Sequence, residues 1–222
     1  MKLEINSIKK SYKKNQVLRG ASLEAVSGES IGILGKNGSG KSTLFSVLCG
    51  LVKGEGEFLL DSRDLMKSPK ERAAAVGFIT QEPPLFPELS AKDNLLLWYS
   101  ADRIKKSLEG GVLSMLGIGE FLKVPVSKMS GGMKKRLAIG CAVARDPCVL
   151  LLDEPSGALD IVCRQRIGEY LAAFRAAGGI TVTATHDVHE LSSCNKLYVL
   201  KDGTLTLHNG ERDTKTLAEL LL

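Results

Sequence analysis

Residues 35–43 read GKNGSGKST and match the GxxxxGK[ST] pattern of a phosphate-binding loop. An apolar run precedes this phosphate loop and a helical pattern follows it, which is the context that the pattern needs. Its glycines let successive backbone N–H groups surround phosphate oxygens, while Lys41 reaches the terminal phosphates and Ser42 places its hydroxyl on Mg²⁺. The candidate nucleotide-binding residues of the loop are Gly35, Asn37, Gly38, Ser39, Gly40, Lys41, Ser42 and Thr43.

Two adjacent carboxylates end the apolar stretch CVLLLDE, residues 148–154. Asp153 is placed to hold Mg²⁺ through water, and Glu154 to polarise a water for in-line attack on the γ-phosphate. The alternative is an acidic strand end that caps the following helix. We favour the metal-linked interpretation, because two charges directly after four apolar residues are costly without a cation.

Gln81 and His186 end two further apolar runs, so a parallel sheet would carry both side chains toward the phosphates. Glutamine can contact metal and water there, and histidine can hydrogen-bond the γ-phosphate. Gln81 therefore joins Ser42 and Asp153 as a candidate metal ligand, and the candidate catalytic residues are Glu154, His186, Lys41 and Gln81. Each signal alone is weak, since a histidine at a strand end is more often a structural hydrogen-bond partner. The sequence HDVHE also allows a metal site on two histidines, but no third ligand supports it.

A second glycine pair follows a serine in KMSGGMKKRLAIG, and we call residues 130–132 the SGG turn. The serine and the N–H groups of Gly131 and Gly132, at the start of a helix expected over residues 133–145, form an anion site with a favourable dipole. The turn also reads as a simple N-cap, with Ser130 as the capping residue of an amphipathic core helix. Because one nucleotide has only one γ-phosphate and the phosphate loop holds it, the SGG turn either binds something else or faces a phosphate bound to another molecule.

These residues depend on a framework of alternating strands and helices. Helical patterns with apolar residues at i, i+3, i+4 and i+7 cover residues 44–51 and 167–174. Near-continuous apolar strands between helices suit a parallel sheet covered on both faces, with its ligand beyond the carboxyl ends of the strands. The predicted strands are residues 30–35, 75–81, 148–154 and 180–186.

Other regions depart from this alternation. Residues 1–30 and 54–64 are expected to form a small antiparallel sheet, and an Asp-Gly turn near the C-terminus predicts a hairpin. Residues 85–146 are mainly helical in pattern, with Ser90 and Asp93 as a capping box. The predicted fold is therefore α/β: a phosphate-loop NTPase core, a small antiparallel β subdomain and a helical subdomain, all in one domain over residues 1–222.

The composition limits the classes of function. A net charge of +5 and 44% hydrophobic residues are ordinary for a globular α/β protein and do not demand a nucleic-acid partner. No signal-peptide pattern and no apolar run of membrane-spanning length is seen, so a cytoplasmic chain is expected. The five cysteines include no CxxC pair and are expected to be buried reduced thiols.

The ordered set of motifs resembles the nucleotide-binding domain of ATP-binding cassette (ABC) transporters. The resemblance covers essentially the whole chain, and SGG followed by a basic helix and DEP is its most specific part. The matching residues are 35–42, Gln81, 130–132, 149–154, 156–160 and His186.

The resemblance implies an ATPase that uses ATP and Mg²⁺ and works as a homodimer or heterodimer with a second ATP-binding subunit. Each ATP would lie between one subunit's phosphate loop and the other subunit's SGG turn. Tyr12 would stack on adenine, although an ordinary strand aromatic is the simpler alternative. Gln81 would begin the segment that senses an integral membrane permease, and Asp160 would cross the dimer interface. Glu154 would be the general base and His186 the switch residue.

Two motifs depart from the family pattern. Met133 stands where LSGGQ has glutamine, and SGGM before basic residues resembles export-type subunits that pair with small permeases. Gly157 stands in PSGALD where serine is commoner, and its flexibility bears on the coupling between sites.

We therefore expect a motor subunit, cytoplasmic and peripheral on the inner face of the cell membrane, that powers transport, in the export direction, through a separate permease. The alternative is a soluble ABC ATPase with a nucleic-acid-associated or regulatory role. Known soluble ABC ATPases of that kind carry two cassettes in one chain or a long coiled-coil insertion, and this chain has neither. A non-hydrolysing module and a nucleotide kinase fit less well, because the catalytic set and the SGG turn are both present. The sequence does not identify the transported substrate.

Overall fold

The computed structural model describes residues 1–155 and 159–221. Within them, the largest sheet has the strand order β10-β9-β3-β8-β7-β6. All neighbours in it are parallel except the hairpin pair β9 and β10. The strands are β3 (Ser30–Leu34), β6 (Val76–Ile79), β7 (Val149–Asp153), β8 (Ile180–Ala184), β9 (Lys196–Lys201) and β10 (Thr204–His208).

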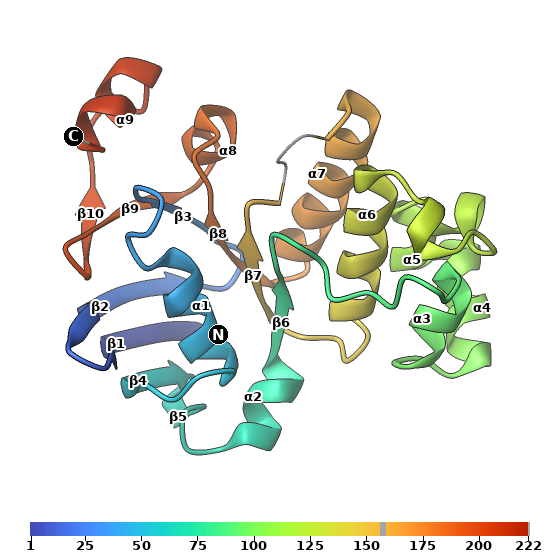
Figure 1. The fold of residues 1–222 in the computed structure, drawn as a ribbon, viewed down its shortest axis with the longest axis horizontal. Coiled ribbons are helices and arrows are strands. Elements are labelled where there is room, and N and C mark those ends of the chain that lie inside the picture. The colour runs from blue at the N-terminus through green and yellow to red at the C-terminus, as the bar shows by residue number, and fades with distance from the viewer. Residues whose placement is uncertain (156–158, 222) are drawn as a thin grey trace.

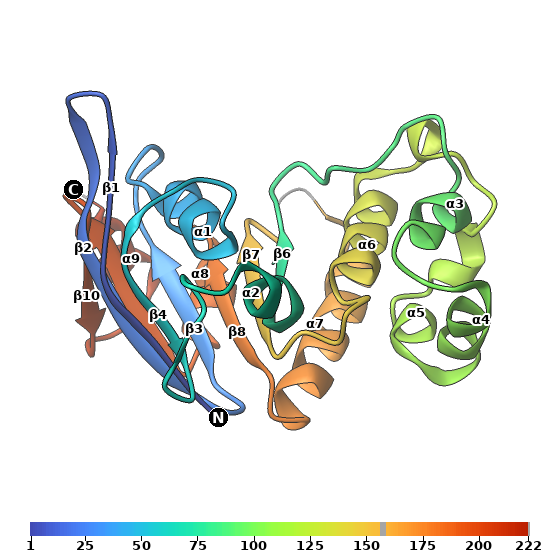
Figure 2. The same ribbon diagram turned by 90° about the horizontal axis from the view of Figure 1, so that it is seen from below.

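A second, antiparallel sheet has the order β2-β1-β4-β5. Its strands are β1 (Lys2–Tyr12), β2 (Asn15–Val26), β4 (Glu55–Leu60) and β5 (Arg63–Asp64). The sheet lies at one end of the molecule beside the main sheet, with helix α1 (Lys41–Cys49) between the two (Figure 2). The α/β prediction and the small antiparallel sheet are therefore confirmed.

The helices of residues 91–142 gather at the other end of the molecule, as Figure 1 shows. The α-helices α3 (Ala91–Leu96), α4 (Ala101–Gly110), α5 (Val112–Met115) and α6 (Gly131–Ala142), with the 3₁₀ helices η1 (Ile118–Phe121) and η2 (Val126–Lys128), fill the region predicted to be helical. The remaining helices are α2 (Pro69–Ala75), α7 (Ile161–Ala176), α8 (Val188–Ser192) and α9 (Thr214–Leu220). Helix α6 begins at Gly131, two residues earlier than predicted, because Ser130 caps it. It ends at Ala142, three residues earlier than predicted.

The buried strand β7 shows why its first four residues are all apolar. Val149 and Leu151 pack into the core that includes α1 and the antiparallel sheet. Leu150 and Leu152 point to the opposite face and pack with residues of α3, α6 and α7. A strand covered on both faces buries alternate residues in two different cores, so no polar alternation is seen.

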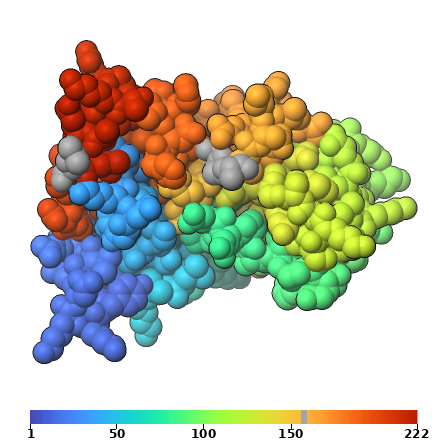
Figure 3. Space-filling model, turned by 45° about the horizontal axis from the view of Figure 1, so that its top comes forward, coloured from blue at the N-terminus to red at the C-terminus, as the bar shows by residue number. Residues whose placement is uncertain are grey.

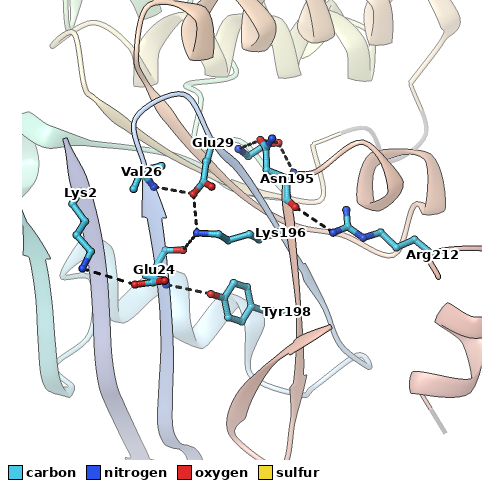
Figure 4. A network of polar contacts seen from close by, with 9 residues as sticks. Lys2, Glu24, Val26, Glu29, Asn195, Lys196, Tyr198 and Arg212 are labelled. Atoms are coloured by element: carbon cyan, nitrogen blue, oxygen red, sulfur yellow. Dashed lines mark hydrogen bonds and ion pairs between the residues drawn. The ribbon is translucent and has the colours of Figure 1, made fainter. Parts of the chain in front are cut away.

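Polar contacts join the two sheets at the start of β3 (Figure 4). The Lys196 ammonium lies 3.1 Å from the Glu29 carboxylate. The Glu24 N–H donates to the Tyr198 hydroxyl at 3.4 Å, and the Ser30 N–H donates to the Asn195 side-chain oxygen at 2.8 Å. These contacts fix β2 and β9 relative to the strand that leads into the phosphate loop.

Candidate active site

A cavity of about 450 Å³ lies at the carboxyl ends of the parallel strands. The loop after β3 and the start of α1 form one wall together with Val17 of β2, and the residues that end or follow β6, β7 and β8 form the rest. The structure thus brings together most of the residues that were expected to bind and hydrolyse a nucleotide. The lining residues are Val17, Asn37, Gly38, Gly40, Lys41, Ser42, Thr43, Gln81, Asp153, Glu154 and His186.

The Lys41 side chain is buried and curls back over the phosphate loop. Its Nζ donates to the backbone oxygens of Gly35 at 2.6 Å and Lys36 at 3.2 Å. Burial lowers the pKa of Lys41, while the nearby carboxylates of Glu154 and Asp153 oppose that shift. The amine is therefore held at the loop by carbonyl oxygens that a phosphate could replace.

The loop approaches its ligand space closely, without side chains in the way. Gly40 has a φ of 109°, and a Cβ there would lie 3.0 Å from a methyl group of Val17. The Ser39 hydroxyl is buried and has no hydrogen-bond partner within the described residues. An orphaned buried hydroxyl is uncommon in a folded protein. This loop therefore fits a polar ligand such as a phosphate chain. Gly35 and Ser39 support the loop but are not among the residues that line the cavity.

The two carboxylates at the end of β7 have different surroundings. Asp153 is the last residue of the strand and is buried, whereas Glu154 has a positive φ of 47°. The Glu154 N–H donates to the Ala184 oxygen at 2.8 Å, which anchors this strained residue to β8. One Glu154 oxygen lies 3.0 Å from His186 Nδ1, and the other accepts a 3.4 Å hydrogen bond from the Thr185 hydroxyl. The predicted base and switch residue are therefore in direct contact.

The oxygen ligands around the cavity suit Mg²⁺. Ser42 supplies a hydroxyl, Asp153 a carboxylate and Gln81 an amide oxygen, all on the walls of the same cavity. No group of three or more His, Cys, Asp or Glu residues that could hold a metal occurs among the residues that the structure describes. Mg²⁺ is commonly held by one or two carboxylates together with substrate phosphates, so this donor set fits that arrangement.

The SGG turn lies outside this cavity. Ser130 is exposed at the start of α6, and its hydroxyl accepts a 3.2 Å hydrogen bond from the Met133 N–H. The N-cap interpretation is thus present in the structure, and at the same helix start Gly131 is exposed while Gly132 is buried. In Figure 3 the N-terminal strands and the C-terminal segment lie at one end of the face shown, and the helical region lies at the other.

Asp160 begins α7 in the same way that Ser130 begins α6. Its carboxylate accepts a 2.8 Å hydrogen bond from the Cys163 N–H. The Cys163 thiol in turn donates to the Gly132 oxygen at 3.4 Å, so the two helix starts touch. Asp160 does not line the nucleotide cavity, and Ser156 and Gly157 fall outside the described residues.

Tyr12 lies at the β1–β2 hairpin and does not line the cavity. Its side chain is 45% exposed, and Lys10 Nζ lies 4.8 Å from the ring centroid. Its role in adenine stacking therefore stays a prediction. Two residues of the site escaped sequence reasoning: Val17, whose place depends on β2 reaching the loop, and Thr185, which only the fold brings to Glu154.

Comparison with known proteins places the chain among transport proteins. The family model described as "ABC transporter" matches residues 18–157. The lantibiotic transport ATP-binding protein SrtF of Streptococcus pyogenes is 30% identical over 220 residues, which is 98% of this chain and 95% of that protein. The lipopolysaccharide export system ATP-binding protein LptB of Acidithiobacillus ferridurans is 33% identical over 210 residues, 90% of this chain and 87% of that protein. A solved dimeric ATP-binding cassette in a post-hydrolysis state, bound to ADP and Pi, has a TM-score of 0.82 at 28% identity and covers 93% of this chain and 97% of its own.

Proposed function

This chain belongs to the ABC transporter family of ATP-binding proteins, and we propose that it is the ATP-hydrolysing motor subunit of an export system. Two such subunits close around ATP, and hydrolysis reopens them. The second subunit is a copy of this chain or a related one, and the motion drives a separate membrane permease. The relative LptB is named for lipopolysaccharide export, which supports this direction of transport.

One observation carries the proposal: the SGG turn lies outside the nucleotide cavity of its own chain. The cavity already contains a loop lysine, two carboxylates and a histidine for one triphosphate. A second anion-binding helix start therefore has a role only if another subunit brings its ATP to it. The resemblance to a solved cassette dimer agrees with that arrangement.

In this proposal each residue of the cavity has a defined task. Lys41 and the loop N–H groups bind the β- and γ-phosphates. Ser42, Asp153 and Gln81 hold Mg²⁺, which supplies charge stabilisation at the phosphates when it is bound. Glu154 takes the proton of the attacking water.

The remaining tasks fall to residues around that centre. His186 holds the Glu154 carboxylate through its Nδ1 contact and senses the γ-phosphate. Tyr12 stacks on the adenine, and Asp160 reaches across the interface between the two subunits.

The surface that follows Gln81 suits the permease. A groove of about 380 Å³ lies between the core and the helical region. Four of its lining side chains are largely exposed although they are large and apolar: Leu51 at 67%, Phe86 at 54%, Leu97 at 53% and Trp98 at 54%. Exposed apolar clusters of this kind mark interaction sites. No helix in the described part of the chain is long and apolar enough to span a membrane. In this proposal the membrane spans belong to the permease, and the chain binds it at the inner membrane face.

The first experiment replaces the proposed base. Glu154→Gln should bind ATP and Mg²⁺, turn over at least about a hundredfold more slowly, and elute as a stable dimer of 23.8 kDa chains, because the phosphate contacts remain while the base is lost. Steady-state ATPase assays and size-exclusion chromatography with light scattering measure both effects. Glu109→Gln, an exposed change on α4, is the matched control and should behave as wild type. Unimpaired ATPase in Glu154→Gln would refute the assigned base.

The second experiment separates the two halves of one ATP site. Ser130→Arg blocks the SGG turn and Lys41→Ala disables the phosphate loop, so each variant alone should be inactive. Mixed together they form dimers with one intact composite site and should regain ATPase activity. Ser127→Arg, three residues before the turn and also exposed, should stay active alone. Failure of the mixture to regain activity would count against a site shared between subunits.

A further inference from the structure

Lys135 is a buried cation in the helix that begins at the SGG turn. Its side chain is only 4% exposed, although lysine is rarely buried without a partner. The Nζ donates to the backbone oxygen of Thr80 at 3.0 Å and to that of Gln81 at 3.3 Å. The ammonium of α6 therefore binds the backbone of a residue that lines the nucleotide cavity.

The charge of Lys135 belongs to the same electrostatic group as the catalytic carboxylates. Burial lowers its pKa, while the carboxylates of Asp153, Glu190 and Glu154 act in the opposite direction. Lys41 shows the same pattern with Asp153 and Glu154. Two buried lysines thus share the acidic pair, one from the phosphate loop and one from α6.

The position of these contacts matters for how Gln81 is held. Thr80 and Gln81 directly follow β6, where the chain leaves the core and runs toward the groove and α3. Gln81 itself is exposed, so packing does not fix it. Lys135 lies five residues after Ser130, which is little more than one helical turn. A shift of the SGG turn along the axis of α6 would therefore move the Lys135 amine and the two carbonyls that it binds.

We propose that Lys135 is a positioning residue that holds Gln81 in place at its own chain's ATP. Through the same contacts, residues 80 and 81 move together with the SGG turn. This inference rests on the proposed function, since it needs an ATP-hydrolysing dimer. Lys135 thus links two parts of one chain: the SGG turn, which binds the partner's ATP, and Gln81, which lies at the chain's own ATP. Lys135 acts through the Gln81 backbone and does not touch the nucleotide.

The primary test is Lys135→Met, which keeps the aliphatic stem and removes the charge and all three donors. We expect kcat for ATP hydrolysis to fall about tenfold or more with KM changed less than about threefold, since the loss is in the placement of Gln81 and not in phosphate binding. Lys134→Met, the neighbouring half-buried lysine, removes the same charge from α6 and should keep wild-type kinetics. Lys135→Arg, which keeps charge and donors, should recover most of kcat.

Tryptophan fluorescence shows whether residues 80 and 81 are still held in place. Trp98 is the only tryptophan of the chain and lines the same groove as Thr80, so its fluorescence reports on this segment. ATP should change the fluorescence of wild type and Lys134→Met, and the change should be reduced in Lys135→Met. Far-UV circular dichroism and thermal melting show whether each variant is folded, and if Lys135→Met is not, Lys135→Gln, which also lacks the charge, replaces it.

Mixed dimers distinguish positioning of Gln81 from general damage to α6. In the mixture of Ser130→Arg and Lys41→Ala chains, the intact site takes its phosphate loop from the first chain and its SGG turn from the second. Lys135→Met should abolish most of the activity when it is placed on the Ser130→Arg chain and little when it is placed on the Lys41→Ala chain. Equal effects on both chains, or wild-type kcat in Lys135→Met dimers, would overturn the inference. The ATP-bound Glu154→Gln dimer tests the proposed function separately, so each can fail without the other.

Discussion

At the scale of single residues, Gly132 links the SGG turn to the neighbouring helix α7. A Cβ at this position would lie 2.9 Å from the Cys163 sulfur and 3.2 Å from its Cβ, closer than normal packing allows. At Gly131 a Cβ would meet nothing within 4 Å. The second glycine of the turn is therefore required by its contact with Cys163, whereas the first is free of that constraint.

Gly132→Ala should accordingly destabilise the fold, by about 1 to 3 kcal/mol of unfolding free energy, as overpacked core substitutions do. Gly131→Ala is the matched control and should be neutral or slightly stabilising, because alanine favours a helical position over glycine. Cys163→Ala in the Gly132→Ala background should restore part of the loss, since it removes the sulfur but keeps the Cβ. Urea unfolding followed by circular dichroism measures all of these. Equal stability of the two glycine variants would contradict the close contact.

At the scale of elements, one side chain fixes the segment between Gln81 and α3. Asn94 is only 1% exposed. Its side-chain oxygen accepts a hydrogen bond from the Phe86 N–H at 2.9 Å, and its side-chain nitrogen donates to the Phe86 backbone oxygen at 3.2 Å. The nitrogen also donates to the Ser90 oxygen at 3.0 Å. These contacts hold Phe86 at the groove that we assign to the permease.

Asn94→Leu keeps the branched shape and the number of side-chain heavy atoms but removes these hydrogen bonds, at a cost of about 1 to 3 kcal/mol for each polar group left buried without a partner. We expect a lower urea midpoint and faster hydrogen exchange at residues 85–90, with the strands of the core unaffected in exchange. Asn209→Leu, an exposed asparagine near the C-terminus, is the control and should change neither. Unchanged exchange at residues 85–90 would show that the segment is held by other contacts.

The sequence allowed prediction of those elements whose own pattern is strong. The central strands carry long apolar runs, and Ser90 with Asp93 forms the predicted capping box. Short helices such as α2 and α8 were missed, because their stability comes from packing and not from a periodic pattern. The phosphate loop and the DE pair could be found because their chemistry is local. Val17, Thr185 and Lys135 could not, because their roles depend on contacts between distant segments.

At the scale of the whole molecule, the nucleotide cavity draws on both sheets. Val17 comes from the antiparallel sheet, while the phosphate loop, Gln81, Glu154 and His186 follow strands of the main sheet. Lys196 and Tyr198 of β9 contact β2 and the turn that follows it. These contacts join the same two sheets near the start of β3, away from the cavity. A ligand in the cavity therefore stabilises the core as one unit, and a single thermal transition should shift when it binds.

ATP at about a hundred times its dissociation constant should raise the unfolding free energy by about 2.7 kcal/mol and the melting temperature by about 5 to 10 °C, since only the native chain binds it. EDTA in this assay prevents hydrolysis, so the shift reports binding to the loop alone. Lys41→Ala should lose most of the shift because the buried ammonium no longer meets the terminal phosphates, whereas Lys53→Ala on the exposed surface should keep it. The quantity compared is the shift for each variant and not its absolute melting temperature, since Lys41→Ala also removes two hydrogen bonds within the loop. A full shift in Lys41→Ala would mean that ATP stabilises the chain from a site other than this cavity.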